Sequence, residues 1–401
     1  MKLDIIAGAR PNFMKIAPII AALEKVSNKI QYRLIHTGQH YDKKMSGSFF
    51  EQLGIPEPHV NLEVGSGTQA EQTGRIMERY EALLLDRHSD RATEKAKSLP
   101  AAGRESQGRG RDSSTPLHSG QNDNSFTGMS DWVLVVGDVT STMACSIAAK
   151  KLGVGVIHVE GGIRSHDITM PEEINRMVTD SITDIFYTTS EVANENLRNL
   201  GHDESKIRYV GNTMIDTLLK NMPRLQKPAA WNNLSLKEKE YFVMTLHRPA
   251  NVDEETQLKN LIDEIVKGAQ GMPIVFPVHP RTAKMLKGIG IEADNLHMIE
   301  PLGYLEFNYL VKNSFAVITD SGGITEETTV MKVPCMTLRD NTERPETITI
   351  GTNELVGTNP DNIAPFMKKL HVGDWKEGEI PYLWDGKTSE RIVEDLLGIG
   401  Y

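Results

Sequence analysis

The segment VIHVEGGIRSHDITMPEEINRMVTD, residues 156–180, decides which kind of fold to expect. Its first residues belong to an apolar run, VGVIHV, which is typical of a buried strand. Six charged side chains follow at once: Glu160, Arg164, Asp167, Glu172, Glu173 and Arg176. In an open α/β sheet, ligands bind where the chain leaves the carboxyl end of a strand. Acids and arginines at this point therefore indicate a site rather than an ordinary solvent-exposed face.

Apolar runs separated by helical patterns occur on both sides of this segment. The first half contains KLDIIAG, YRLIHTG, DWVLVVGD, VGVIHVEGG and DIFYTTS, and the second contains EYFVMTLH, MPIVFPVHP, LHMIEP, FAVITDSGG and VPCMTLRD. Strands that alternate with helices are typical of βαβ units and parallel sheets. We therefore predict an α/β protein with two doubly wound, Rossmann-like domains, residues 1–209 and 210–387, and an interdomain cleft. A last amphipathic helix, 388–401, fits either domain, and we expect it on the first.

The bulk composition excludes several classes of protein. The 401 residues, 39% of them apolar, suffice for two or three domains with large cores. No apolar run reaches the roughly 20 residues of a membrane span and no secretory signal is apparent, so we expect a cytoplasmic protein. The formal net charge of −10 argues against binding to nucleic acid or a membrane surface. Cys145 and Cys335 lie in apolar surroundings and are expected to be buried free thiols.

One segment, residues 89–128, breaks the alternating pattern. It is polar and rich in Gly and Ser, which predicts a disordered or mobile loop. Because it precedes the strand DWVLVVGD, it should lie at the amino edge of the sheet, opposite the ligand-binding edge. Its basic part, GRESQGRGR, would also suit contact with RNA, but a solvated loop fits an acidic protein better. We expect this insert to be dispensable for chemistry.

Two further strand ends of the first half carry candidate groups. The strand KLDIIAG leads into a helix near Pro11, so Arg10 and Lys15 would lie at a helix start that favours anions. The alternative for Lys15 is an ordinary surface position on that helix. Asp138 follows the strand DWVLVVGD and precedes another helix, where it either transfers protons or simply caps the helix. The residues themselves leave both interpretations open.

The second half offers groups suited to a phosphorylated ligand. TDSGGITEET places Ser321, Gly322 and Gly323 between a strand and a helix, where glycines let a phosphate approach the helix amides. Glu327, a turn further on, can accept hydrogen bonds from ribose hydroxyls. Cations follow three strands of this half, namely His247, Arg248, His279, Arg281, Arg339 and Arg344. On an acidic protein, this repetition indicates a diphosphate ligand.

Metal binding is the main rival interpretation of the acids and histidines. The sequence contains no close-spaced ligand pattern such as His-Glu-x-x-His or Cys-x-x-Cys. A Mg²⁺ ion held together with substrate phosphates needs only one or two acids. We expect no required metal.

Ten motifs, taken in chain order, resemble one known family. They are GARPNFMK, HTGQHYD, GDVTSTMA, HVEGGIRS, MPEEINR, GNTMID, LHRP, PVHPR, TDSGGITEE and RDNTERPE, and they resemble the non-hydrolysing UDP-N-acetylglucosamine 2-epimerases. The resemblance implies two Rossmann-like domains of the glycosyltransferase-B type and a homodimer. It also implies interconversion of UDP-GlcNAc and UDP-ManNAc without a cofactor. In that family UDP is eliminated to give a 2-acetamidoglucal, which is reprotonated before UDP adds back.

The resemblance assigns roles to residues that match the family motifs. Asp138, Glu160 and Glu172 would transfer the C2 proton, while Lys15 and His247 would assist the departing phosphate. UDP-sugar binding would involve Arg10, Lys15, His247, Phe307, Ser321, Gly322, Gly323, Glu327 and Arg344, with Phe307 against the uracil. Supporting residues would be Arg164, Arg176, His279 and Arg339, with Arg176 orienting Glu172. Gln39 and His40 match a motif beside a second, activating UDP-GlcNAc site.

Other functions remain open at this point. Close relatives epimerise UDP-2,3-diacetamido-2,3-dideoxyglucuronic acid and share the same motifs. A glycosyltransferase is a second alternative, because the same fold serves many enzymes that use UDP-sugars, although a transferase has no evident need for three clustered acids. A catalytically inactive nucleotide-sugar sensor is a third, and the intact acids argue against it.

Overall fold

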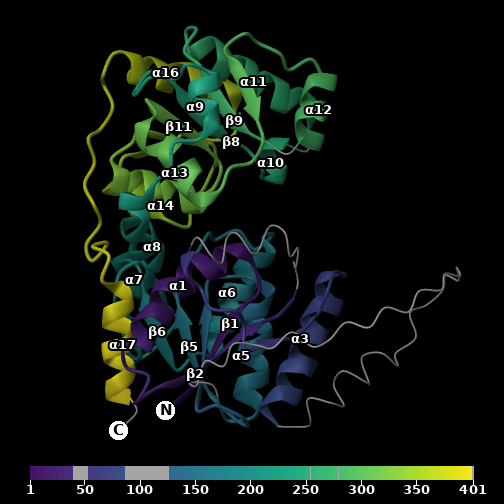
Figure 1. Cartoon of the computed structure of the whole chain (residues 1–401), viewed down its shortest axis with the longest axis vertical. Coiled ribbons are helices and arrows are strands. Elements are labelled where there is room, and N and C mark those ends of the chain that lie inside the picture. Colours follow the sequence, from purple (N-terminus) through teal and green to yellow (C-terminus); the bar gives the residue numbers. More distant parts are fainter. Residues whose placement is uncertain (39–52, 86–125, 253, 279, 400–401) are drawn as a thin grey trace, which may run out of the picture.

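Two parallel sheets, one in each half of the chain, form two stacked bodies in the computed structural model (Figure 1). The structure describes residues 1–38, 53–85, 126–252, 254–278 and 280–399. The first sheet has seven strands in the order β3-β2-β1-β4-β5-β6-β7, and the second has six in the order β10-β9-β8-β11-β12-β13. The predicted α/β fold with two doubly wound sheets is thereby confirmed.

The first half follows the predicted alternation of strands and helices. Its strands are β1 (Lys2–Ala7), β2 (Gln31–His36), β3 (Val60–Asn61), β4 (Trp132–Val136), β5 (Gly155–Val159), β6 (Ile185–Thr188) and β7 (Ile207–Tyr209). Its helices are α1 (Arg10–Glu24), α3 (Gln69–Leu84), α5 (Thr140–Lys151), α6 (Pro171–Ile182), α7 (Glu191–Asn199), the 3₁₀ turn η1 (Glu204–Lys206) and α8 (Thr213–Asn221).

The second half repeats the alternation with a smaller sheet. Its strands are β8 (Phe242–Thr245), β9 (Ile274–Pro277), β10 (Leu296–Ile299), β11 (Ala316–Thr319), β12 (Cys335–Thr337) and β13 (Asn353–Leu355). The remaining helices are η2 (Met222–Arg224), α9 (Ala229–Asn233), α10 (Pro249–Val252), α11 (Glu255–Gly268), α12 (Pro280–Gly288), α13 (Tyr304–Asn313), α14 (Gly322–Met331), α15 (Pro345–Thr349), η3 (Pro360–Asn362), α16 (Ile363–His371) and α17 (Thr388–Ile399).

The central strands are mostly apolar on both of their faces because helices cover both sides of each sheet. In β4, Leu134 and Val136 pack into the cluster formed with α1, while Val133 and Val135 face the cluster formed with α3 and α5. All four side chains are fully buried. Burying one such side chain contributes about 1.5–3 kcal/mol to folding. The sheets are therefore rigid supports for the turns at their carboxyl edges.

Each sheet has one point where the strand order reverses. In the first sheet this point lies between β1 and β4, and in the second it lies between β8 and β11. The chain leaves each pair of strands in opposite directions there, which opens space for a ligand beyond their carboxyl ends. Motifs that follow these four strands are thus placed where a ligand is expected.

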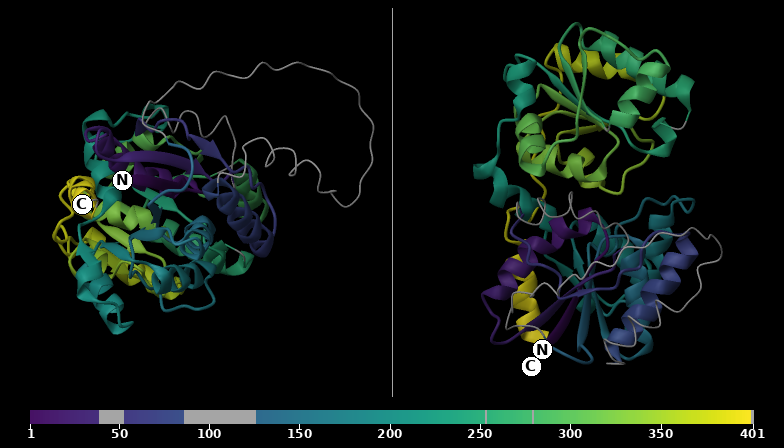
Figure 2. Two further views of the ribbon diagram at one scale, coloured as in Figure 1. Left: turned by 90° about the horizontal axis from the view of Figure 1, so that it is seen from below. Right: turned by 45° about the vertical axis from the view of Figure 1, so that its right-hand side comes forward.

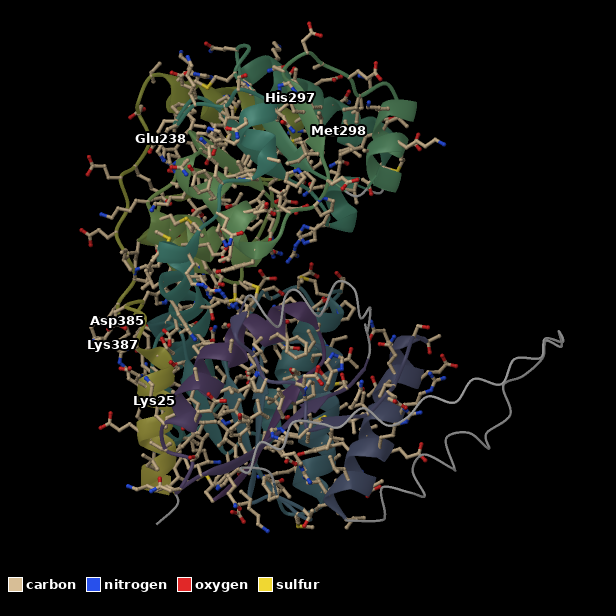
Figure 3. All side chains as sticks on the ribbon, viewed as in Figure 1. Lys25, Glu238, His297, Met298, Asp385 and Lys387 are labelled. Atoms are coloured by element: carbon tan, nitrogen blue, oxygen red, sulfur yellow. The ribbon has the colours of Figure 1, made fainter. Side chains whose placement is uncertain are left out.

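One helix and one long segment connect the halves. Helix α8 packs against α1 of the first half and α14 of the second. After α16 the chain runs back along the outside of the molecule to α17, which packs against α1 and α8 (Figures 1 and 2). Asp216 of α8 accepts the N–H groups of Thr388 and Ser389 at 3.1 and 2.7 Å, and so caps α17. Figure 3 shows Asp385 and Lys387 on the outer side of this return segment.

Three smaller expectations concern the cysteines, membrane-spanning helices and the insert. Cys145 and Cys335 are buried free thiols, as predicted. In the described part of the chain, no helix is both long and apolar enough to cross a membrane. Most of the insert 89–128 lies outside the described residues. Its flank Asp131 donates its N–H to the carbonyl of Lys2 at 2.9 Å, which places this end of the insert at the amino edge of the first sheet.

Candidate active site

Glu160 occupies the turn that follows β5, and its backbone adopts a left-handed conformation with φ of 68°. This conformation is uncommon for residues other than glycine, and such strained residues concentrate at functional sites. The backbone N–H of Glu160 is fixed by a 2.8 Å hydrogen bond to the carbonyl of Tyr187 at the end of β6. Its side chain reaches α1, where Lys15 Nζ lies 2.6 Å from Glu160 Oε2.

Gly137 and Asn12 shape the surroundings of this ion pair. Gly137 has φ of +68°, and a Cβ atom there would lie 3.2 Å from Lys15 Nζ and 3.7 Å from Glu160 Oε2. A side chain at this position would crowd the pair. Asn12 accepts the N–H groups of Gly8 and Ala9 at 3.1 Å and donates to the carbonyl of Val136 at 2.9 Å. It therefore fastens the turn before Lys15 to the end of β4.

Arg344 of the second half completes the surroundings of Glu160. Its Nη2 lies 3.0 Å from Glu160 Oε2, and its Nε donates to Glu326 Oε1. Burial alone would raise the pKa of Glu160, but the charges of Lys15 and Arg344 outweigh it and hold the pKa below its usual value. Among the described residues, nothing bonds to the buried Glu160 Oε1. Glu160 is thus an ionised carboxylate with one oxygen left for another partner.

Asp138 lies beside this cluster, in the turn after β4. Its carboxylate pairs with Arg176 Nη2, and its carbonyl accepts a 2.8 Å hydrogen bond from Asn175 of α6. Because β4 and β5 are neighbouring strands, Asp138 and Glu160 leave the sheet side by side. The structure therefore brings together two of the three predicted carboxylates.

Arg176 does not orient Glu172, contrary to the expectation from its position one helical turn away. Its Nη1 bonds instead to Glu173 Oε2 at 2.9 Å, because Glu173 lies on the buried face of α6 and Glu172 on the exposed face. No hydrogen bond or ion pair joins the Glu172 side chain to another residue in the described part of the chain. The proton-transfer role of Glu172 stays a prediction.

Glu343 was missed from the sequence and links the supporting arginines. Its carboxylate lies 2.5 Å from Arg339, 3.5 Å from Arg248 and 3.7 Å from Arg176 of the first half. Burial alone would raise the pKa of Glu343, but these three cations lower it to about 2. Glu343 and Arg344 are adjacent, so one loop between β12 and α15 makes ion pairs with the Glu160 turn and with Arg176 of α6, the partner of Asp138.

His247 follows β8 and is held by an aspartate at the end of β11. Its Nδ1 lies 2.7 Å from Oδ1 of the fully buried Asp320, which also accepts the N–H groups of His247 and Arg248 at 3.0 and 2.9 Å. The His247 side chain is 61% exposed. An anchored Nδ1 leaves Nε2 free to meet a ligand, which is the usual arrangement of a histidine oriented by a carboxylate.

The residues predicted to bind an anion in the second half lie at the start of α14. Ser321 precedes the helix, and Gly322 and Gly323 form its first turn. A Cβ atom on Gly322 would lie 3.9 Å from Arg339 Nη1, the nearest neighbour, so the arginine adds charge close to the helix amides. Exposed amides, the helix dipole and a nearby guanidinium together favour a phosphate.

Glu327 and Phe307 lie deeper in the second half. Glu327 accepts hydrogen bonds from the Tyr304 hydroxyl at 2.8 Å and the Asn308 amide at 3.4 Å. Burial raises the pKa of Glu327 to about 7. Phe307 is half-buried on α13, in the cluster that also contains Leu310 and Val311. Their roles toward ribose and uracil stay predictions.

The other predicted residues divide into two groups. Arg164 forms a 2.7 Å ion pair with Asp180 of α6 and is buried beneath the acid-bearing turns. Arg10 begins α1, but its side chain is outside the described part of the chain, as are Gln39, His40 and His279.

Two further observations concern metal binding and surface hollows in the described part of the chain. No group of three or more His, Cys, Asp or Glu side chains within them is arranged to hold a metal ion. A surface hollow lined by Lys2, Glu24 and Asp131 lies at the amino edge of the first sheet, at the opposite strand ends from Glu160.

Fold and site together define an α/β enzyme with two parallel sheets, in which acidic and basic side chains meet at the carboxyl ends of the strands. The chain belongs to the UDP-N-acetylglucosamine 2-epimerase family, whose model matches residues 22–92 and 126–397. Members of this family are isomerases. The family resemblance of the ten sequence motifs is thereby confirmed.

Relatives match along the full length of the chain. A UDP-N-acetylglucosamine 2-epimerase from Methanocaldococcus jannaschii is 40% identical over 99% of both chains. A crystal structure of the M. jannaschii enzyme in complex with UDP-GlcNAc and UDP aligns at 39% identity over 99% of both chains, with a TM-score of 0.78. A UDP-2,3-diacetamido-2,3-dideoxy-D-glucuronate 2-epimerase from Pseudomonas aeruginosa is 34% identical over 99% of both chains.

Proposed function

We propose that the protein interconverts UDP-GlcNAc and UDP-ManNAc by reversible elimination and re-addition of UDP. The observation that carries this proposal is the position of Glu160, an ionised carboxylate held between Lys15 and Arg344 and next to Asp138. Such a cluster places proton acceptors beside cations that suit a diphosphate. The M. jannaschii relative, which binds UDP-GlcNAc and UDP in its crystal structure, supports this choice of substrate.

The first chemical step removes the proton from C2 of the sugar. A carboxylate, Glu160 or Asp138, accepts this proton while the C2–H electron pair forms a C1=C2 double bond. The C1–O bond breaks at the same time, and its electron pair leaves with UDP. Protonation of C2 from the other face, followed by re-addition of UDP to C1, gives the epimer. Glu172 is the third proposed participant in these proton transfers.

Departure of UDP places additional negative charge on the diphosphate, and several cations are placed to stabilise it. Lys15 and Arg344 already surround Glu160, and His247 presents an exposed ring from the second half. The first turn of α14 adds the backbone amides of Gly322 and Gly323. Fixed donors and charges that meet developing charge lower the barrier because they need no rearrangement during the reaction.

The decisive experiment is incubation with UDP-GlcNAc in deuterated water, followed by NMR of the sugar. The proposal expects UDP-ManNAc to appear, with deuterium at C2 of both sugars. Free ManNAc together with UDP would instead show a hydrolysing enzyme, and protium retained at C2 would contradict proton exchange. If the protein turns over UDP-2,3-diacetamido-2,3-dideoxyglucuronic acid but not UDP-GlcNAc, the proposed substrate is wrong and the diacetamido uronate takes its place.

We propose in addition that residues 1–209 and 210–387 act as two domains that close over the ligand in a cytoplasmic homodimer. Two separate sheets, each with its own core, support the division of the chain. Sedimentation of the purified protein with and without UDP measures both the oligomeric state and any compaction.

A further inference from the structure

A fully buried histidine lies directly beneath the two acid-bearing turns. His158 is the fourth residue of β5, and its side chain makes two short polar contacts. His158 Nε2 lies 2.9 Å from the carbonyl oxygen of Gly137, the residue before Asp138. His158 Nδ1 lies 2.6 Å from Oδ1 of Asp180, which is also fully buried. One ring therefore joins the turn after β4 to helix α6.

Both ring nitrogens of His158 make a hydrogen bond, and the contact with the carbonyl fixes the direction of one of them. A backbone carbonyl oxygen only accepts hydrogen bonds, so Nε2 carries a hydrogen. Nδ1 contacts the Asp180 carboxylate, so the carbonyl of Gly137, the ring of His158 and Asp180 form one continuous hydrogen-bonded chain.

The second oxygen of Asp180 fastens the other acid-bearing turn. Asp180 Oδ2 accepts the N–H of Gly162 at 3.1 Å, two residues after Glu160, and lies 2.7 Å from Arg164 Nη2. One carboxylate thus ties the Glu160 turn to α6 directly and, through His158, ties the Asp138 turn to the same helix. Helix α6 also carries Arg176, the ion-pair partner of Asp138.

We infer that His158 and Asp180 are positioning residues that fix the distance and orientation between the carboxylates of Asp138 and Glu160. Proton removal on one face of C2 and return on the other require two acids held in register with one sugar carbon. Misplacement of a reacting group by about 1 Å costs on the order of 100-fold in rate. The inference rests on the proposed epimerisation, and the wild-type reaction in deuterated water tests that premise separately.

The main test compares two variants with a matched control. His158→Phe keeps an aromatic ring but removes both ring nitrogens, and Asp180→Ala removes the carboxylate that His158 and Gly162 share. The control is Asp4→Ala, which breaks the ion pair of a different fully buried acid. Arg33 donates two hydrogen bonds to the Asp4 carboxylate, each of 2.9 Å. Asp4 lies on β1 near the amino edge of the same sheet, away from the acids. All three variants are expected to lose thermal stability.

The kinetic constants separate positioning from stability. We expect kcat of the folded His158→Phe and Asp180→Ala variants to fall about 100-fold, with KM for UDP-GlcNAc within about threefold of wild type. Asp4→Ala should keep the wild-type kcat. Asp180→Asn should retain most activity, because an amide still accepts from Gly162 and donates to a neutral His158. Wild-type kcat in His158→Phe, or an equal loss in Asp4→Ala, would overturn the inference.

A measurement on the unaltered protein covers the case in which the variants fail to fold. NMR of wild-type protein with ¹⁵N-labelled histidine should show one ring whose Nε2 carries a hydrogen that is protected from exchange with solvent. A buried ring with no hydrogen on Nε2 could not bond to the carbonyl of Gly137 and would refute the proposal.

Discussion

The guanidinium of Arg344 lies 3.0 Å from the carboxylate of Glu160, although the two residues belong to different halves of the chain. The same guanidinium also donates to Glu326 through Nε. A diphosphate that binds between the halves would compete with Glu160 for Arg344. Ligand binding would then remove one of the two cations that keep the pKa of Glu160 low. The acid would become a stronger base at the moment the substrate arrives.

Arg344→Lys should therefore lower kcat/KM although it keeps the charge. A lysine ammonium has all its donors on one nitrogen, so it cannot replace both Nε and Nη2, the two atoms by which Arg344 bonds to Glu326 and Glu160. One hydrogen bond to a charged group contributes about 1.5–3 kcal/mol. We expect a loss of about 10- to 100-fold in initial-rate kinetics with UDP-GlcNAc. Arg198→Lys is the matched control, because Arg198 also pairs with two acids, Glu191 and Glu204, but on the surface of α7. Wild-type kinetics in Arg344→Lys would contradict the role of the guanidinium.

Glu160→Gln and Asp138→Asn test the proposed proton transfers. Each change keeps the shape of the side chain but removes a proton acceptor, so turnover should fall by roughly 10² to 10⁴ fold. UDP binding, measured by calorimetry, should stay close to wild type because the cations remain in place. Loss of UDP binding in step with turnover would instead mean that the two acids maintain the binding site.

The framework of the fold was predictable because its long central strands have a strong sequence signal. The runs that became β1, β4 and β11 are apolar at nearly every position, and helices follow each of them. The strands β3, β7 and β13 were not predicted. They have only two or three residues, too few to show any periodicity. Their pairing depends on the neighbouring strand rather than on their own residues.

The candidate site was predictable only where its residues follow strands. Asp138, Glu160 and His247 all come directly after an apolar run, so position alone marks them. The residues that hold them in place cannot be recognised in the same way. His158 and Asp180 are 22 residues apart in the sequence and come into contact only in the folded chain. Spacing also misled, because it suggested that Arg176 pairs with Glu172 four residues earlier. The buried face of α6 selects Glu173 instead.

Glu343→Gln should weaken the folded protein most at neutral pH. The pKa of Glu343 falls from an ordinary 4.5 to about 2 in the folded state, so its ion pairs stabilise the protein fully above pH 4.5. This stabilisation is lost as the pH falls toward 2. A shift of this size corresponds to about 3 kcal/mol. Urea unfolding should show a lower free energy of unfolding for the variant than for wild type at pH 7, and this difference should shrink below pH 4. A difference that does not change with pH would exclude the ion pairs as its cause.

Glu346→Gln should have the opposite pH dependence. Glu346 is 4% exposed, and neither carboxylate oxygen has a hydrogen-bond partner among the described residues. Burial raises its pKa to about 7, so the folded protein is stabilised below pH 4.5 and loses this stability as the pH rises through 7. The free energy of unfolding of the variant should therefore rise, relative to that of wild type, by on the order of 3 kcal/mol between pH 4.5 and 8. The exposed Glu379→Gln serves as control, and a gain that does not change with pH would reject ionisation of Glu346 as the cause.

Deletion of residues 93–125 should leave catalysis unchanged. The family model matches the chain on both sides of this segment but not within it. Its carboxyl-terminal flank leads into β4 at the amino edge of the sheet, where Trp132 pairs with Leu3 and Gly155. This five-residue strand is about 16 Å long at 3.3 Å per residue, and Asp138 lies beyond its other end.

The deletion variant should carry a short Gly-Ser linker and keep Phe126, whose ring lies 4.7 Å from the guanidinium carbon of Arg33. We expect kcat and KM for UDP-GlcNAc within about twofold of wild type, since the strand between the deletion and the acids is fixed by pairing on both sides. A control with the same linker inserted before residue 126, without deletion, separates the effect of the linker from that of the missing residues. A large loss of activity in the deletion alone would place the segment near the reacting sugar rather than at the opposite edge of the sheet.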